Sequence, residues 1–212
     1  MPFDFLKRRK TESAPTQEAP PAGPSELRFD GITEEWRLVG TMIVEGRMSD
    51  ALNKREPIDI VGVTWAPIDG SSPMVPAPGL KSVDPYDLVL VLGGTSSLPE
   101  MSEEERTAHR VHKVSYEVAL EVPPYRVVGT VFLYPGSEPD RLLDRSAEMF
   151  LPVVGATVTM ADRAIGDPNL EVVLVNRAYL RGVEQVDART GERVEKLPGA
   201  PLGGTNWTDR VR

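Results

Sequence analysis

Two Arg-x-x-Asp patterns are the most conspicuous polar features of the sequence. Arg47 and Asp50 form the first, and Arg141 and Asp144 form the second, in matching places of two similar stretches. On a helix, residues three apart lie on one face within reach of an ion pair. The favoured interpretation is structural, either an exposed pair worth about 0.3 kcal/mol or a link from the helix to its surroundings. The functional alternative is a binding face that occurs twice.

Histidine and glutamate side chains gather near the middle of the chain. His109 and His112 follow Glu103, Glu104 and Glu105. On one continuous helix, Glu105 and both histidines would share a face. The alternation of polar and apolar residues from 111 onward instead indicates a strand, which separates the histidines, and a third nitrogen or sulfur ligand is missing. We therefore predict no metal site.

The sequence shows no pattern typical of catalysis. Residues 93–97, GGTSS, lack the lysine and spacing of a phosphate-binding loop. The carboxylates of Asp140 and Asp144 are expected on the outside of a short helix. The chain has no cysteine, which excludes disulfides, thiolate metal sites and cysteine nucleophiles. We predict a protein that is not an enzyme and that needs no cofactor.

The first ten residues, MPFDFLKRRK, are apolar and then basic. Their candidate interaction residues are Phe3, Phe5, Leu6, Lys7, Arg8, Arg9 and Lys10. Such a segment can insert its apolar side chains at a lipid headgroup boundary while its cations meet anionic lipid, at about 1 kcal/mol per basic residue. The alternatives are a groove on a protein, and a solubilising start that docks nowhere.

Charge and hydropathy restrict the partners. The net charge is −8, and the four basic and four acidic residues of 1–26 cancel, so the acidic excess lies on 27–212. A nucleic-acid interface needs clustered Lys and Arg, so nucleic acid is not expected. No apolar run approaches the roughly 18 to 20 residues that span a membrane, and the start is unlike a secretory signal. We expect a cytoplasmic protein, peripheral to the inner face of the membrane if the N-terminal segment anchors it.

The elements that must position these residues occur twice. WRLVGTMIVEG at 36–46 matches YRVVGTVFLYP at 125–135, and the blocks that follow match in the same order. The later pairs are RMSDALNKRE with RLLDRSAEMF, IDIVGVT at 58–64 with LPVVGAT at 151–157, and DLVLVL at 87–92 with EVVLVN at 171–176. Four ordered matches predict an internal duplication, with an extra loop at 66–85 in the first copy. The glycine of each VGT is expected where neighbouring strands approach closely or coil.

The predicted fold is mainly β, a β-rich α+β arrangement. It is a tandem duplication of a small barrel-like or roll-like β module with one short helix per copy. The expected division is a disordered tail and linker at 1–26, a first module at 27–97, a connecting helix at 98–110, a second module at 111–190 and a disordered tail at 191–212. A module of this size is marginal alone, so the two are expected to pack together. Swapping of the strand 111–122 between the halves stays open.

The duplicated pattern resembles a family of uncharacterised bacterial proteins. RLVGTMIVEG, RMSDALN and IDIVGVT carry the resemblance in the first copy, and RVVGTVFLYPG, RLLDRSAEMFLPVV and VVLVNRAYL carry it in the second, over most of 35–187. The resemblance implies a small β domain of strand–helix–strand layout, and it implies no activity or catalytic residue. The order of elements is also similar to that of SH3-like and Sm-like barrels, which bears on fold alone.

Two functions remain open from the sequence. The leading one is a non-enzymatic interaction or adaptor protein that binds a protein partner or a second copy of itself. The alternative is a small-ligand sensor or enzyme with a pocket between the modules, covered by the loop 66–85. A filled interface between the modules would favour the adaptor, and an apolar pocket with convergent polar groups would favour the sensor.

Overall fold

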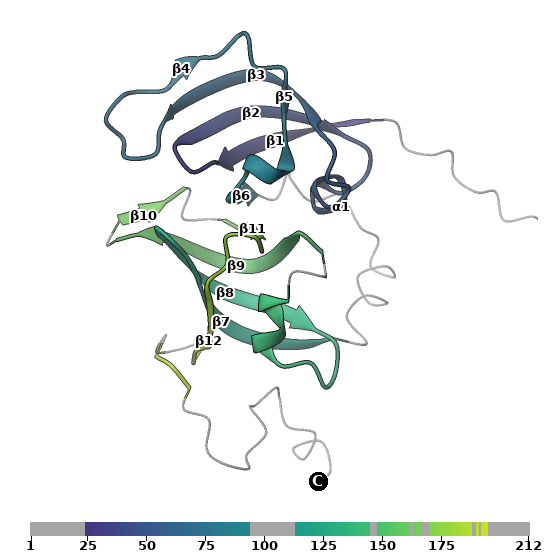
Figure 1. Cartoon of the computed structure of the whole chain (residues 1–212), viewed down its shortest axis with the longest axis vertical. Coiled ribbons are helices and arrows are strands. Elements are labelled where there is room, and N and C mark those ends of the chain that lie inside the picture. Colours follow the sequence, from purple (N-terminus) through teal and green to yellow (C-terminus); the bar gives the residue numbers. More distant parts are fainter. Residues whose placement is uncertain are drawn as a thin grey trace, which may run out of the picture.

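The computed structural model describes residues 24–93, 113–144, 148–161, 163–166, 170–187, 190 and 192–194. The fold is mainly antiparallel β, which confirms the predicted class (Figure 1). The first half contains β1 (Ser25–Ile32), β2 (Trp36–Val44), α1 (Met48–Asn53), β3 (Ile58–Pro67), β4 (Val75–Pro76), β5 (Ser82–Val83), the 3₁₀ helix η1 (Pro85–Asp87) and β6 (Leu90–Gly93). The second half contains β7 (Val114–Val122), β8 (Tyr125–Leu133), the 3₁₀ helix η3 (Pro139–Leu143), β9 (Phe150–Met160), β10 (Arg163–Ile165), β11 (Val172–Asn176) and β12 (Gly182–Gln185).

The described strands form one continuous sheet that does not close on itself. Its order is β12-β7-β8-β9-β11-β6-β1-β2-β3-β4, with β10 beside β9 and β5 beside β3. The two halves meet where β6 pairs with β11, so the lower and upper parts of Figure 1 are joined by main-chain hydrogen bonds. The strand 111–122 was predicted to alternate, and β7 does so, with Tyr116, Val118, Leu120 and Val122 buried. β7 pairs with β8 and β12 of its own half, so no swap of this strand occurs in the structure.

The glycine of each VGT lies at a close approach of strands, as predicted. The β2–β3 register shifts between Val39 and Thr41, and the β8–β9 register shifts between Val128 and Thr130. A Cβ on the intervening Gly40 would lie 2.9 Å from the carbonyl oxygen of Val61. A Cβ on Gly129 would lie 3.0 Å from the carbonyl oxygen of Val154. The bulge in each half therefore requires glycine.

The last strands of the halves correspond differently from the prediction. The expected match of 87–92 with 171–176 is wrong, because β6 pairs with β1 whereas β11 pairs with β9. The counterpart of β11 is β5, which pairs with β3, and the counterpart of β6 is β12, which pairs with β7. The turns between these strands also agree: the side chain of Asp84 accepts from the Tyr86 amide, and that of Asn176 accepts from the Ala178 amide, each at 2.9 Å. The stretch 66–85 is thus not a plain loop, since it contains β4 and β5.

The predicted helix of the second half is a short 3₁₀ helix. In α1 the buried side chains are Met48, Ala51 and Leu52, at spacings of three and four that suit an α-helix. In η3 only Pro139 and Leu142 are buried, three residues apart, which is the repeat of a 3₁₀ helix. The chain is already extended at Asp144. One α-helix, in the first half, is therefore found in the described part of the chain.

Two hydrophobic cores share the residues of the junction. Val91 of β6 and Leu174 of β11 belong to the core that contains Phe29 and Met42. Their neighbours Leu90 and Val173 belong to the core of the second half. Because successive side chains of a strand point to opposite faces, β6 and β11 are buried on both sides. Each core is completed by residues of the other half.

Several predicted segments lie outside the described residues. These are the N-terminal segment 1–10, most of the linker 11–26, the connecting helix 98–110 with His109, the neighbouring His112, and the C-terminal tail 191–212 apart from residues 192–194. β1 begins at Ser25, two residues before the predicted start of the first module. Among the described helices, none combines the length and the apolar character that a membrane span requires.

Candidate interaction site

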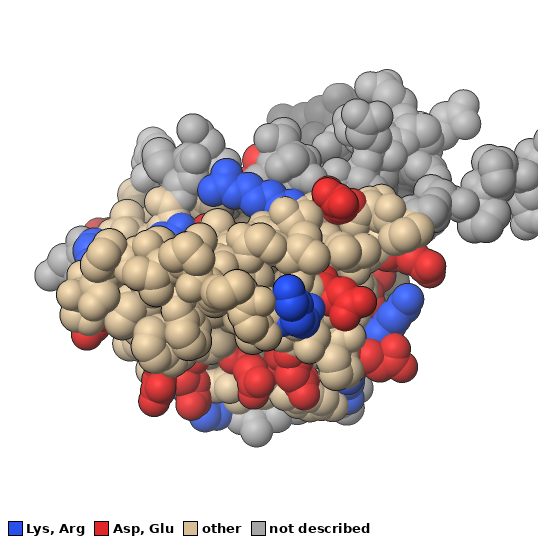
Figure 2. Space-filling view, turned by 90° about the horizontal axis from the view of Figure 1, so that it is seen from above, with Lys and Arg blue, Asp and Glu red and all other residues tan. Residues whose placement is uncertain are grey.

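A surface almost without charge covers β3, β4 and the segment around them. Between residues 60 and 80 the only charged residue is Asp69. Four large apolar side chains of this stretch are exposed: Val61 (43%), Trp65 (37%), Met74 (39%) and Val75 (46%). Figure 2 looks down on this end of the molecule and shows a broad area free of charged side chains, with acidic side chains along one rim. The register places Trp65 and Val75 on the side of the sheet that holds Leu38, whereas Val61 pairs with Thr41 and points to the other side. We call the exposed Trp65 and Val75 and their uncharged surroundings the uncharged face.

Two tryptophans anchor the uncharged face. The rings of Trp36 and Trp65 stack with their centroids 4.8 Å apart and their planes inclined by 22°. The β2–β3 register sets this contact, because Leu38 pairs with Trp65 and Trp36 pairs with Pro67. Val75 of β4 pairs directly with Trp65. A rigid aromatic pair next to an aliphatic side chain is the composition that protein interfaces favour at their centre.

Prolines limit what can bind to the edge of this sheet. β4 is the last strand in the order, and it contains Pro76, with Pro73 and Pro78 on either side. Proline has no amide hydrogen, so it cannot donate to an added strand. The uncharged face is therefore suited to contacts through side chains and poorly suited to strand addition.

A shallow hollow of about 200 Å³ lies beside the tryptophan pair. It is lined by Thr33, Trp36, Leu38, Trp65, Leu80, Ser82, Val83, Asp84 and Asp87. We call it the aromatic groove. None of these lining residues is basic, and the two carboxylates lie at its η1 side. The pKa of Tyr179 is raised by burial and, to a smaller extent, by the negative charges of Glu34 and Asp87. The two carboxylates therefore both lie near Tyr179, and Asp87 also lines the aromatic groove.

A second hollow, of about 360 Å³, lies where the two halves meet. Its lining comes from both, with Arg37 and Met74 on one side and Tyr125 and Arg163 on the other. Arg37 is bound by both oxygens of Asp30, at 2.9 and 2.7 Å. Arg163 donates to the Ile68 carbonyl at 3.2 Å. This junction hollow is the feature that the sensor hypothesis requires.

The hydroxyl of Tyr125 is a polar group at the junction hollow without a partner. The residue is 2% exposed, and its hydroxyl oxygen has no hydrogen bond within the described part of the chain. Burial raises the pKa of the hydroxyl, and the positive charge of Arg163 opposes that shift. The tyrosine is therefore neutral at ordinary pH and able to donate one hydrogen bond.

The Arg-x-x-Asp pairs do not have the predicted helical geometry. Arg47 is the extended residue before α1, and its carbonyl accepts from the amides of Asp50 and Ala51, each at 3.1 Å. Arg141 lies in η3, and Asp144 is the extended residue after it. Each pair is thus split between a helix and its flanking residue. Their role as a repeated binding face stays a prediction.

Other predicted features are outside the description or were not found by sequence reasoning. The seven candidate residues of the N-terminal segment and both histidines lie outside the described residues. Among the described residues, no group of three or more His, Asp or Glu side chains could hold a metal ion. The tryptophan pair was missed. The near absence of charged residues between 60 and 80 was a visible signal for the uncharged face. The stacking of Trp36 on Trp65 depends on the β2–β3 register, which cannot be inferred from the sequence alone.

Comparison of the chain with protein-family models, curated proteins and solved structures found no match. The uncharged face and the two hollows are therefore interpreted from their own chemistry.

Proposed function

We propose that the protein is a non-enzymatic interaction protein that binds an apolar surface of a protein partner through its uncharged face. The observation that carries this proposal is the pair of Trp65 and Val75, which lie directly opposite each other on β3 and β4 and are 37% and 46% exposed, in a stretch almost free of charge. Contiguous exposed apolar side chains bordered by polar ones mark interaction sites on soluble proteins. Binding there removes apolar area from water without desolvating charged groups.

The acidic rim adds selectivity to this proposal. Glu34, Asp84 and Asp87 are exposed beside the tryptophan pair. Charges at the rim of an interface affect partner choice and the rate of encounter more than affinity. The partner that fits is apolar at its centre and basic at its border.

Substitutions at two positions whose side chains are similarly exposed test the proposal. Val75→Glu places a charge within the uncharged face, and Phe132→Glu places one at a residue 44% exposed on β8 of the other half. Both proteins, and the unchanged chain, would be immobilised and exposed to extract of the source organism, and any captured protein would then be purified for direct titration. We expect the Val75→Glu variant to bind the purified partner at least about tenfold more weakly, which corresponds to the burial of one valine side chain. Equal affinity of the two variants would contradict the proposal.

Comparison of the two halves indicates which of them carries the proposed interaction. The agreement of the two glycine bulges and of the turns at Asp84 and Asn176 supports an origin of both halves by internal duplication. The exposed tryptophan is specific to the first half, because Val158 stands at the corresponding place of β9 and is buried. We infer that the first half carries the interaction and that the second half completes its core.

A second candidate is a sensor of a small molecule in the junction hollow. The buried Tyr125 hydroxyl without a hydrogen-bond partner favours it, because such groups in native proteins call for an explanation. Arg163 beside it would suit a ligand with a carboxylate. Screening small carboxylic acids by thermal shift, with Tyr125→Phe as the matched variant, tests this candidate: a stabilising acid whose effect disappears in the variant would support it.

A further inference from the structure

We propose that the N-terminal segment of the same chain, residues 1–10, docks in the aromatic groove. This inference goes beyond the proposed function. It rests on that function only through Trp65, which belongs both to the aromatic groove and to the uncharged face. It assigns an occupant to a hollow and a role to a sequence motif that the uncharged face does not use.

The chemistry of the two parts is complementary. The groove offers the Trp36 and Trp65 rings and the side chain of Leu80, with carboxylates at one side and no basic lining residue. The segment offers two phenylalanines and a leucine, followed at once by four cations in the order Lys, Arg, Arg, Lys. Aromatic side chains pack on tryptophan faces, and arginine and lysine are attracted both by those faces and by carboxylates.

The acidic groups around the groove outnumber its basic neighbours. Asp84 and Asp87 line it, and Glu34 and Glu35 are exposed in the turn that leads to Trp36. Lys81 is exposed between two lining residues but does not line the groove. The carboxylate of Asp84 is already engaged by the Tyr86 amide at 2.9 Å. Asp87 and Glu34 are therefore the principal partners for the cations of the segment.

The chain between the segment and the sheet is long enough for this contact. Residues 11–24 connect the segment to Ser25, and fourteen residues reach at most about 50 Å when extended. From Ser25 the groove lies at the far end of β1, beyond Ile32, a path of about 25 Å along the strand. The connection is thus about twice as long as the path requires.

Attachment to the same chain makes weak docking sufficient. A short connection holds a tethered segment at an effective concentration of about 1 mM. If the free segment bound the groove with a Kd of about 0.1 mM, the groove of an isolated molecule would be roughly nine-tenths occupied. A docked segment would cover the Trp65 side of the uncharged face and keep its cations away from anionic lipid. Partner binding and lipid binding would then both compete with docking.

The test uses the full chain and its own tryptophans. The chain has three, so Trp207→Phe leaves Trp36 and Trp65 as the only fluorophores of their kind, and acrylamide quenching reports how accessible they are. Changing Lys7, Arg8, Arg9 and Lys10 to Glu should roughly double the quenching constant by emptying the groove. The double substitution Glu34→Lys with Asp87→Lys should raise the quenching constant equally, and it leaves the hydrogen bond from the Tyr86 amide to Asp84 intact. Combining both sets should restore low quenching, because the charges are complementary again.

The matched control is a reversal of charge elsewhere. Asp140→Lys with Glu192→Lys changes two exposed acidic residues of the second half and should leave quenching unchanged.

Unchanged quenching in the segment variant would overturn the proposal, as would failure of the combined variant to restore protection. Protection that rises with protein concentration would show docking between copies and overturn the intramolecular form. If the protein sedimented with anionic vesicles, and its tryptophans were not protected when no vesicles were present, the segment would bind lipid and not the groove. Loss of partner binding by Val75→Glu is a separate measurement, so either proposal can fail alone.

Discussion

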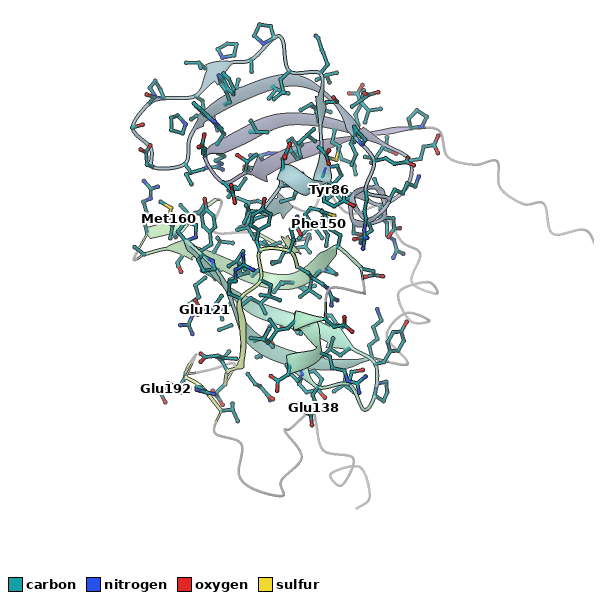
Figure 3. The ribbon with its side chains drawn as sticks, viewed as in Figure 1. Tyr86, Glu121, Glu138, Phe150, Met160 and Glu192 are labelled. Atoms are coloured by element: carbon teal, nitrogen blue, oxygen red, sulfur yellow. The ribbon has the colours of Figure 1, made fainter. Side chains whose placement is uncertain are left out.

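The side-chain amide of Asn176 donates a hydrogen bond of 2.7 Å to the main-chain carbonyl of Leu88, across the junction of the two halves. Asn176 is completely buried, and its amide nitrogen also lies 3.4 Å from the Pro85 carbonyl. On the other side of the junction, Asn53 of α1 accepts from the Phe150 amide at 2.7 Å and lies 3.4 Å from its carbonyl. Figure 3 shows Phe150 between the two halves. Two asparagines thus satisfy main-chain groups of the opposite half.

We expect Asn176→Ala to lower the free energy of unfolding by about 2–4 kcal/mol. The change removes the hydrogen bonds to the Leu88 and Pro85 carbonyls, takes away the side-chain donor of the Leu88 carbonyl and opens a cavity. Asp84→Ala removes the corresponding turn cap at an exposed position and should cost about 1 kcal/mol or less. Urea denaturation of the two variants measures the difference, and equal losses would show that the contact across the junction contributes little.

We expect Gly40→Ala and Gly129→Ala each to destabilise the protein by about 1–3 kcal/mol. The new Cβ would lie within about 3 Å of main-chain atoms of the neighbouring strand, which cannot move aside without disrupting the bulge. Gly79→Ala is the control, because a Cβ there meets nothing within 4 Å, and its effect should stay within about 0.5 kcal/mol. Thermal unfolding followed by circular dichroism ranks the three variants.

We expect Tyr125→Phe to raise the free energy of unfolding by about 1 kcal/mol. The variant removes a buried hydroxyl that has no hydrogen-bond partner in the described structure. The pKa of Tyr125 is raised in the folded state, so the folded protein holds this proton more tightly than the unfolded chain. Stability of the unchanged protein should therefore fall as the pH rises above about 10, and Tyr125→Phe should lack this part of the loss. Denaturation at neutral and alkaline pH measures both effects, and a destabilised variant would indicate that the hydroxyl has a partner in solution.

The strands and the glycine bulges could be predicted because their signals are local. The period-two burial of β7 and the repeated VGT are visible within ten residues of sequence. The correspondence of β5 with β11 could not be predicted in the same way. β6 and β11 are both short runs rich in valine and leucine, whereas β5 is only Ser82–Val83, and the three strands differ in which distant strand they pair with. Pairing partners are set by the whole fold, so the match by composition selected β6.

The candidate site shows the same division between local and distant information. The scarcity of charge in residues 60–80 is visible in the sequence, and Met74 and Val75 of this stretch are exposed in the structure. The stack of Trp36 on Trp65 joins two strands through a register that includes a bulge, and it could not be inferred from either strand alone. Asn176 ends a run of valines and was interpreted as part of a strand, whereas its side chain binds the opposite half.

The double burial of β6 and β11 has a consequence for how the molecule comes apart. Since Leu90 and Val91 face different cores, neither half can leave the other without exposing parts of both. A chain cut once between residues 94 and 112 should therefore stay together as a single particle in gel filtration, held by the strands on either side of the cut. Two separately expressed pieces, 1–103 and 104–212, should each be poorly folded alone and should regain a native β-sheet spectrum when refolded as a mixture. The protein would then behave as a two-part complex that happens to be encoded as one chain.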